Sequence, residues 1–152
     1  MSSHNSGIRK KEGTSGLDER KLLQLAREVL PLAYAPYSEY RVGAALLTSD
    51  GQVFRGVNVE NSSLGLTICA ERAALAAAVA AGCRSFSLLA VVSEDELGPW
   101  PCGACRQVLS EFCDENLKVI ISGKKGEIRR LSMKDLFPYP FIFDKEKLSQ
   151  EK

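Results

Sequence analysis

The chain has 152 residues, of which 45% are hydrophobic and 26% charged, with a formal net charge of +1. This length suits one domain with a single core, and the balanced charge argues against a nucleic-acid binder, which normally carries a strong basic excess. No apolar run approaches the roughly eighteen residues that cross a bilayer, so no membrane role is expected. Residues 1–16 are polar and contain no hydrophobic stretch, which predicts a disordered tail, no secretory signal and a cytoplasmic protein.

Helical and extended patterns alternate along the rest of the chain. In chain order they predict a helix over 17–30, strands over 40–47 and 52–59, a helix over 67–81, a strand over 86–92, a helix over 104–113, strands over 118–121 and 127–131, and a short helix from Ser132. Pro31 should end the first helix because it lacks a backbone N–H, and Thr48-Ser49-Asp50-Gly51 should turn the chain between the first two strands. Thr67 is the candidate cap of the second helix, and Gly82 its stop.

This alternation predicts an α/β sandwich with a mixed central sheet. The first two strands should be antiparallel and the later ones parallel. The sequence contains no internal repeat and no sign of a second domain, so residues 17–152 are expected to form a single domain. Two of the predicted helices begin at cysteines, so their thiols are candidates for a shared chemical role.

Three cysteines carry the chemical signal. Cys102 and Cys105 are separated by two residues, and Gly103 between them permits the tight turn that aims both sulfurs at one tetrahedral ion. A redox dithiol uses the same spacing, so the pair alone leaves both interpretations open. Cys69, at the start of the preceding helix, supplies a third thiolate and leaves the fourth position of a zinc ion to water, as in catalytic sites.

No fourth protein ligand is expected. Cys83 and Cys113 fall about two to three helical turns from the other cysteines, and the single histidine is His4 in the predicted tail. The odd number of five cysteines also argues against a disulfide framework. Three thiolates and one Zn²⁺ carry a net negative charge, which two helix N-termini and the guanidinium of Arg72 would offset. A surface cation on a helix is the simpler interpretation of Arg72.

Glu71 follows Cys69 by two positions, at the head of an alanine-rich helix that has little reason to bury a carboxylate. It is the candidate catalytic acid–base group, which takes a proton from the attacking water and passes it to a ring nitrogen and then to a leaving amine. The alternative is a carboxylate that only stabilises the helix N-terminus. Cys-Ala-Glu combined with Pro-Cys-x-x-Cys is the general signature of zinc deaminases, here with cysteine at all three ligand positions.

On these motifs the chain resembles the homotetrameric family of cytidine deaminases over residues 17–143. The matching stretches are AYAPYS (33–38), VGAALL (42–47), GVNVEN (56–61), CAER (69–72) and PCGACRQVL (101–109). The resemblance implies a three-layer α/β/α fold, one Zn²⁺ per chain, and hydrolysis of cytidine and deoxycytidine to uridine and deoxyuridine plus ammonia in pyrimidine salvage. It also implies a homotetramer with shared active sites.

The same resemblance assigns substrate contacts to five residues. Asn58 and Glu60 would hydrogen-bond the ribose hydroxyls, and the simpler alternative is that both only cap loops. The backbone at Ala70 would contact the base edge, and Tyr40 would pack on the nucleoside. Phe141 would reach the site of a neighbouring subunit and stack on the base.

Three positions depart from the family pattern and are expected to border the nucleoside. Tyr40 replaces the usual Phe, Leu64 replaces an aromatic residue, commonly Tyr, and Trp100 replaces a small residue, often Ser. An indole that points into the pocket would restrict the space around N4 of cytosine, and one that points away would widen that space. Leu64 removes a hydroxyl near the sugar, which predicts relaxed discrimination at the ribose.

Two other functions fit parts of this pattern. A deaminase of a modified cytosine nucleoside, blasticidin-type or N4-substituted, would keep the same zinc chemistry. A non-catalytic binding module stabilised by zinc would keep the metal without the reaction, and loss of cytidine absorbance on incubation separates it from an enzyme. A deaminase that edits nucleic acid needs a basic groove, which the balanced charge does not favour.

Overall fold

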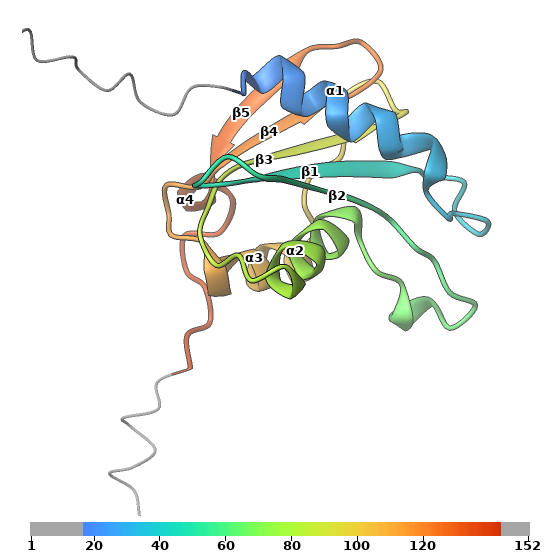
Figure 1. Cartoon of the computed structure of the whole chain (residues 1–152). Helices are drawn as coiled ribbons and strands as arrows, with labels where there is room; N and C mark the ends of the chain where they lie inside the picture. Colours follow the sequence, from blue (N-terminus) through green and yellow to red (C-terminus); the bar gives the residue numbers. More distant parts are fainter. Residues whose placement is uncertain (1–16, 144–152) are drawn as a thin grey trace, which may run out of the picture.

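Five strands form one mixed sheet in the computed structural model, which describes residues 17–143. The strand order is β2-β1-β3-β4-β5 and helices cover both faces, so the described chain is the expected three-layer α/β/α sandwich (Figure 1). In chain order the elements are α1 Glu19–Val29, the 3₁₀ helix η1 Leu30–Leu32, β1 Val42–Thr48, β2 Val53–Val57, the 3₁₀ helix η2 Leu64–Leu66, α2 Ala70–Ala80, β3 Phe86–Ser93, α3 Gly103–Phe112, β4 Lys118–Ser122, β5 Ile128–Ser132 and α4 Met133–Leu136. The predicted tail, residues 1–16, lies outside the described part, as do residues 144–152.

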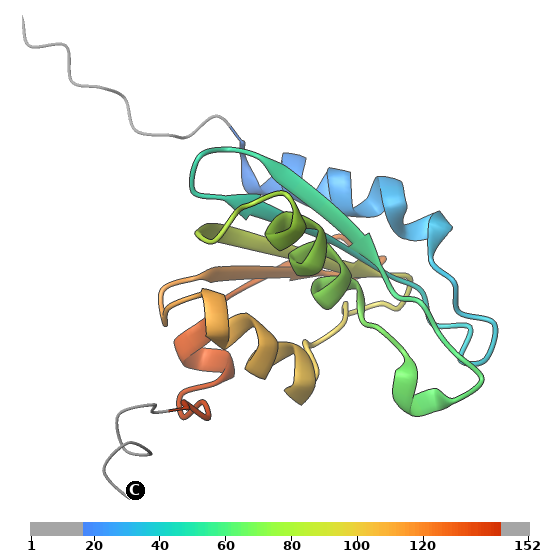
Figure 2. The same ribbon diagram turned by 60° about the horizontal axis from the view of Figure 1, so that its bottom comes forward.

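The sheet separates two apolar cores. α1 lies on one face, and α2 and α3 lie on the other (Figures 1 and 2). Strand β3 is buried on both sides: Leu88 and Ala90 pack in the core on the α1 side, whereas Leu89 and Val91 belong to the core under α2 and α3. This double burial explains why the segment is continuously apolar. Both cysteine motifs therefore belong to the same side of the sheet, because both precede helices of that layer.

The first helix, α1, is shorter than predicted at its start and ends as predicted. The Asp18 side chain accepts a hydrogen bond from the backbone N of Arg20 at 2.6 Å, which caps the helix at Glu19. The regular turns end at Val29, and the chain tightens into η1, which contains Pro31. Among residues 17–143, no helix combines the length and the apolar composition that crossing a bilayer requires.

The strand directions follow the prediction except at one edge. β1 and β2 form the expected antiparallel hairpin, and β3 and β4 are parallel. The expectation that the last strands are also parallel is wrong for β5, which runs antiparallel to β4. The connection explains the difference, because residues 123–127 are too few for the crossover that a parallel pair requires.

The two helices that carry the cysteine motifs begin directly after a cysteine. Cys69 precedes α2 and Cys102 precedes α3, both with extended backbone. The prediction that Thr67 caps α2 is wrong, since Thr67 follows η2 and the helix begins only after Cys69. The backbone of Ile68 pairs with Val59 in an antiparallel bridge, so the chain is still extended where the helix was expected to start.

The close approach of α2 to the sheet depends on Gly56 in β2. A Cβ atom at this position would lie 2.4 Å from the carbonyl oxygen of Ala70 and 2.4 Å from the backbone nitrogen of Ala74. These distances are well inside van der Waals contact, so glycine lets the first turn of α2 lie against the strand. Because that turn carries Glu71, Gly56 sets the distance of this carboxylate from the sheet. At its other end the helix stops at Gly82, which has a φ of +91°, as predicted.

Candidate active site

The sulfurs of Cys69, Cys102 and Cys105 come together at the N-termini of α2 and α3. The Sγ atoms of Cys69 and Cys102 are 3.7 Å apart, those of Cys102 and Cys105 are 3.5 Å apart, and all three lie within 4.8 Å of one another. Thiolates at about 2.3 Å from a tetrahedral zinc ion lie about 3.8 Å from one another. The spacing of the three sulfurs therefore fits one zinc ion.

The three sulfurs differ in their access to the surface. Cys105 is buried, Cys69 is half-buried and Cys102 is exposed. An ion held by them would face the protein on one side and the surface on the other. Cys83 and Cys113 do not belong to the group. Three sulfur ligands with one position left open are the donor set of a catalytic zinc site rather than a closed structural one.

Hydrogen-bond donors and positive charge surround the sulfurs. Arg72 Nη2 donates to the carbonyl of Thr67 at 3.0 Å and to Cys69 Sγ at 3.7 Å, and its Nε is buried with no hydrogen-bond partner among residues 17–143. The backbone N–H of Cys105 donates to Cys102 Sγ at 3.4 Å. The Cys105 thiol donates a hydrogen bond to Cys69, and this bond, together with the contact from Arg72, lowers the pKa of Cys69 to about 5. The hydrogen bond to Cys69 and burial raise the pKa of Cys105. This environment stabilises the thiolate of Cys69, the form that binds a metal, whereas Cys105 keeps its proton until a metal displaces it.

Glu71 is the buried carboxylate of the site, with 4% of its surface exposed. It stands in the first turn of α2, next to the fully buried Ala70. Burial raises the pKa of Glu71 to about 7, and the negative charge of Cys69 adds to this rise. A carboxyl group with such a pKa can both hold and release a proton near neutral pH, which general acid–base chemistry requires.

Asn58 and Glu60 hold the loop that precedes β1. The Asn58 side chain accepts a hydrogen bond from the backbone N of Val42 and donates one to the carbonyl of Tyr40, both at 2.8 Å. The Glu60 carboxylate accepts from the backbone nitrogens of residues 37–38 at 3.0 and 3.2 Å. Both residues therefore cap this loop, the simpler of the two interpretations of the sequence. Their contact with ribose stays a prediction.

Tyr40 lies at the end of this loop with 38% of its surface exposed, and the structure gives its hydroxyl partners that sequence reasoning missed. The hydroxyl donates its single proton to Asp95 Oδ2 at 2.7 Å and lies 3.3 Å from Ser93 Oγ. Burial raises the pKa of Tyr40, and the negative charges of Asp95 and Glu71 contribute to the rise. These partners could have been found only from the pairing of β1 with β3, which brings the start of β1 next to the end of β3.

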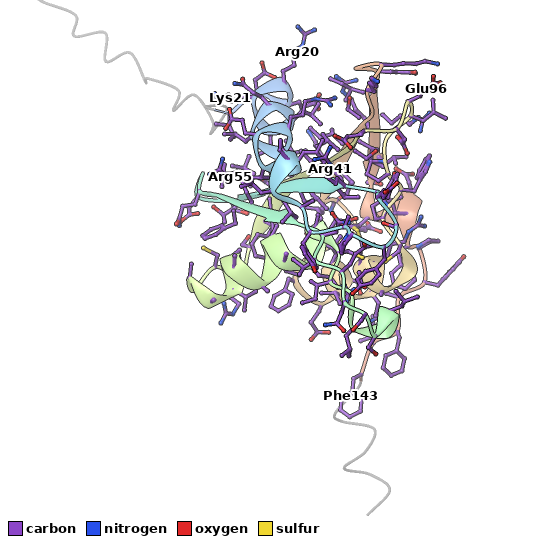
Figure 3. The ribbon with its side chains drawn as sticks, turned by 90° about the vertical axis from the view of Figure 1, so that its right-hand side faces the viewer. Arg20, Lys21, Arg41, Arg55, Glu96 and Phe143 are labelled. Atoms are coloured by element: carbon purple, nitrogen blue, oxygen red, sulfur yellow. The ribbon has the colours of Figure 1, made fainter. Side chains whose placement is uncertain are left out.

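Phe141 belongs to the segment after α4, whose backbone is anchored to α3. Its side chain is 72% exposed, and its backbone forms two hydrogen bonds with the side chain of Gln107, one in each direction, at 2.9 and 3.2 Å. Arg106, the preceding residue of α3, donates to the carbonyl of Leu136 at 2.6 Å. Phe143, two positions further, is labelled below the body of the molecule in Figure 3. Sequence reasoning missed both anchors, although they lie inside the matching stretch 101–109.

Trp100 and Leu64 both lie on the surface. The guanidinium carbon of Arg129 is 5.7 Å from the centre of the indole ring, a cation–π contact with the edge strand β5. α2 packs on β1 and β2, toward the opposite edge of the same sheet. The indole is therefore drawn toward β5 and away from α2, the outward orientation of the two considered. Leu64 is the first residue of η2, a segment that projects beyond the sheet and helices in two views (Figures 1 and 2).

The comparison with protein families agrees with the geometry of the sulfur centre. Residues 17–121 match the family model described as the cytidine and deoxycytidylate deaminase zinc-binding region. This stretch contains all three cysteines of the centre, Glu71, the helices α1, α2 and α3, the strands β1, β2 and β3, and all but the last residue of β4. The chain belongs to the cytidine and deoxycytidylate deaminase family.

Named relatives and solved structures extend this similarity over most of the chain. The cytidine deaminase of Sporosarcina psychrophila is 45% identical over 133 residues, which cover 88% of this chain and 96% of the relative. The cytidine deaminase of Halalkalibacterium halodurans is 44% identical over 125 residues, which cover 82% of this chain and 95% of the relative. The crystal structure of cytidine deaminase from Burkholderia pseudomallei is 47% identical with a TM-score of 0.80, and covers 82% of this chain and 100% of that one. The crystal structure of cytidine deaminase from Mycobacterium tuberculosis is 38% identical with a TM-score of 0.72. The match covers 84% of this chain and 99% of that one.

Proposed function

We propose that the protein hydrolyses cytidine and deoxycytidine to uridine and deoxyuridine, with release of ammonia and with one zinc ion per chain. One observation carries this proposal. Three cysteine sulfurs at the N-termini of two helices lie within 4.8 Å of one another, and the buried carboxylate of Glu71 stands beside them on one of those helices. A reaction of this kind serves pyrimidine salvage.

The reaction replaces the exocyclic amine of the base by the oxygen of one water molecule. Cys69, Cys102 and Cys105 would hold the zinc, which would supply the Lewis acidity that activates water. Glu71 takes one proton from the attacking water and passes it to the ring nitrogen N3. It then moves the second proton of that water, from the new hydroxyl on C4, to the leaving amine, so that the C–N bond breaks with one water consumed and one ammonia released. Its burial keeps bulk water from competing for the proton, and Arg72 offsets part of the charge of the three thiolates.

The substrate contacts are also part of the proposal. Tyr40 would pack on the nucleoside, the backbone at Ala70 would bind the base edge, and Asn58 and Glu60 would bind the ribose hydroxyls. The loop contacts of Asn58 and Glu60 support this indirectly, because they fix the backbone on both sides of Tyr40. A carboxylate and an amide held this way keep acceptors ready for hydroxyl groups.

We further propose a homotetramer in which Phe141 completes the site of a neighbouring copy. The exposure of Phe141, Ile142, Leu64 and Leu66 in a single chain supports it, because apolar side chains in such number usually mark an interface.

A cytoplasmic location is supported by the five free thiols of the described chain. A single catalytic domain over residues 17–152 is supported by the one sheet that joins all the described strands.

An ultraviolet assay tests the proposed reaction. The purified protein is incubated with cytidine, deoxycytidine, N4-methylcytidine and a 5′-modified cytidine, and the loss of cytosine absorbance is followed with ammonia release as a second readout. We expect turnover of cytidine and deoxycytidine with one ammonia per nucleoside. Turnover of the N4-methyl compound alone would assign the protein to modified nucleosides, and turnover of none of the four would contradict the proposal.

A further inference from the structure

The antiparallel pairing of β1 and β3 continues beyond the strands through side chains. The last backbone pair of the ladder is Val42 with Ser93. Two positions further along the same register, Tyr40 faces Asp95, and the hydroxyl of Tyr40 donates to Asp95 Oδ2 at 2.7 Å. A side-chain hydrogen bond thus holds together two segments after the backbone ladder has ended.

Asp95 joins this pair to the loop that follows β3. Its Oδ1 accepts hydrogen bonds from Ser93 Oγ at 2.9 Å and from the backbone N of Gly98 at 2.5 Å, while Oδ2 accepts from Tyr40. Its backbone carbonyl accepts from the backbone N of Lys124 at 2.6 Å. One carboxylate therefore connects the segment before β1, the end of β3 and the loop beyond it.

The loop held by Asp95 leads to the metal centre and rests on a close backbone contact. Gly98 has a φ of +85°, and a Cβ atom there would lie 2.7 Å from the carbonyl carbon of Ser122. A Cβ atom at Gly123 would lie 2.4 Å from the nitrogen of Gly98. The loop is thereby packed against the end of β4 only four positions before Cys102, so a shift at Asp95 reaches the metal ligand through a short, rigid stretch.

Tyr40 is held from two directions on the face of the sheet that carries the metal centre. Val42 and Ala44 of β1 belong to the core under α2 and α3, and continuing this alternation two residues before the strand predicts the same face for Tyr40. The side chain of Asn58 donates to the Tyr40 carbonyl, and Asp95 accepts from its hydroxyl. A phenylalanine at this position has no hydroxyl, so it cannot form the second contact.

We propose that Asp95 is a positioning residue of the nucleoside site: its carboxylate fixes the ring of Tyr40, on which the nucleoside packs, and ties this ring to the loop that delivers Cys102. The inference rests on the proposed function, because it assigns Asp95 a part in binding the same substrate. Asp95 acts through Tyr40 and Gly98 and has no contact of its own with the reacting atoms.

The neighbouring pair, Arg41 and Glu94, provides a matched control. Arg41 and Glu94 face each other in the same register, between the Tyr40–Asp95 pair and the strands, with N···O distances of 2.6 and 3.1 Å. Because side chains alternate, this pair is expected on the α1 face of the sheet. Both side chains are exposed, and Figure 3, which looks onto this end of the molecule, labels Arg41. Such an exposed pair contributes little to stability or to the geometry of the opposite face.

The test compares Tyr40→Phe, Asp95→Asn, the double variant and the control Glu94→Gln. For each we measure kcat and KM for cytidine, the affinity for uridine by calorimetry, the zinc content and the melting temperature. We expect Tyr40→Phe to raise KM and the Kd of uridine about three- to tenfold, with kcat within about twofold and zinc unchanged. Asp95→Asn should raise KM at least as much as Tyr40→Phe. The double variant should raise KM no more than Asp95→Asn alone, because both changes remove the same contact. Glu94→Gln should match the wild type.

The outcomes separate this inference from the proposed function. If wild-type protein does not deaminate cytidine, the proposed function fails, and the inference fails with it. If wild-type protein is active, unchanged KM and Kd in Tyr40→Phe overturn the inference alone. Lower melting temperatures without any change in KM would show a purely structural contact and would also overturn it. Tyr40→Phe removes one oxygen atom, so it decides the matter even if Asp95→Asn does not fold.

Discussion

The metal centre and the nucleoside side of the site are built in different ways. The centre is local: three sulfurs and Glu71 stand in or just before the first turns of two helices that start at cysteines. The proposed nucleoside side would be assembled from the loop before β1, from η2 and from the segment 137–143, whose large apolar side chains are mostly exposed in one chain. In the proposed enzyme, one chain holds the reactive groups, whereas recognition depends on loop positions and on neighbouring copies.

The largest expected effect comes from a metal ligand. We expect Cys102→Ala to lose zinc and cytidine deamination together, because two sulfurs cannot complete the open tetrahedral site. Zinc content and activity are measured on the same sample. The matched control is Cys83→Ala, the same substitution outside the sulfur centre, which should keep both. A Cys102→Ala protein with normal zinc and activity would remove this residue from the centre.

The next effect concerns the proton. Glu71→Gln keeps the shape of the side chain and should keep zinc, but it cannot accept a proton from water. We expect kcat to fall about 10²- to 10⁴-fold, the usual contribution of a general acid–base group, with the melting temperature close to that of wild type. Zinc analysis and steady-state kinetics check this together. A variant within tenfold of the wild-type rate would leave Glu71 with a structural role only.

The nucleoside side is tested at Phe141. Loss of a stacked aromatic ring costs about 1–3 kcal/mol per base, so Phe141→Ala should raise KM roughly five- to 150-fold with zinc unchanged. The control is Leu32→Ala, which removes an equally exposed apolar side chain (74%) from η1, an element with no part in the proposed site. Light scattering on the wild type should give a tetramer. An active monomer at micromolar concentration would contradict the shared site.

The smallest effects are expected at two departures from the family pattern. Leu64→Tyr returns a hydroxyl near the sugar and should change the ratio of kcat/KM between cytidine and a 5′-modified analogue about two- to tenfold, the range of one hydrogen bond. Trp100→Ser should leave the ratio between cytidine and N4-methylcytidine unchanged, because the indole packs toward Arg129. A large change in the N4-methylcytidine ratio of Trp100→Ser would show that the indole ring lies in the pocket. An unchanged 5′-analogue ratio in Leu64→Tyr would show that Leu64 is a neutral surface residue.

The parts of the site that depend on short sequence spacing could be predicted. The Cys102–Cys105 spacing, with Cys69 at a helix start, predicted a group of sulfurs that the structure brings together. Asp95 could not be found this way, because it meets Tyr40 only through the register of β1 with β3. The same limit explains the wrong direction of β5, which depends on the length of one connection, and the wrong cap at Thr67, where pairing of Ile68 keeps the chain extended.

The central claim is that the three-sulfur centre holds the zinc on which deamination depends. The most direct measurement follows zinc content and cytidine turnover in one preparation while a chelator removes the metal and added zinc returns it, with circular dichroism recorded throughout. We expect about one zinc per chain, activity that falls in proportion to the zinc removed, and recovery when zinc is restored to folded protein. Full activity in protein shown to be free of metal would contradict the account.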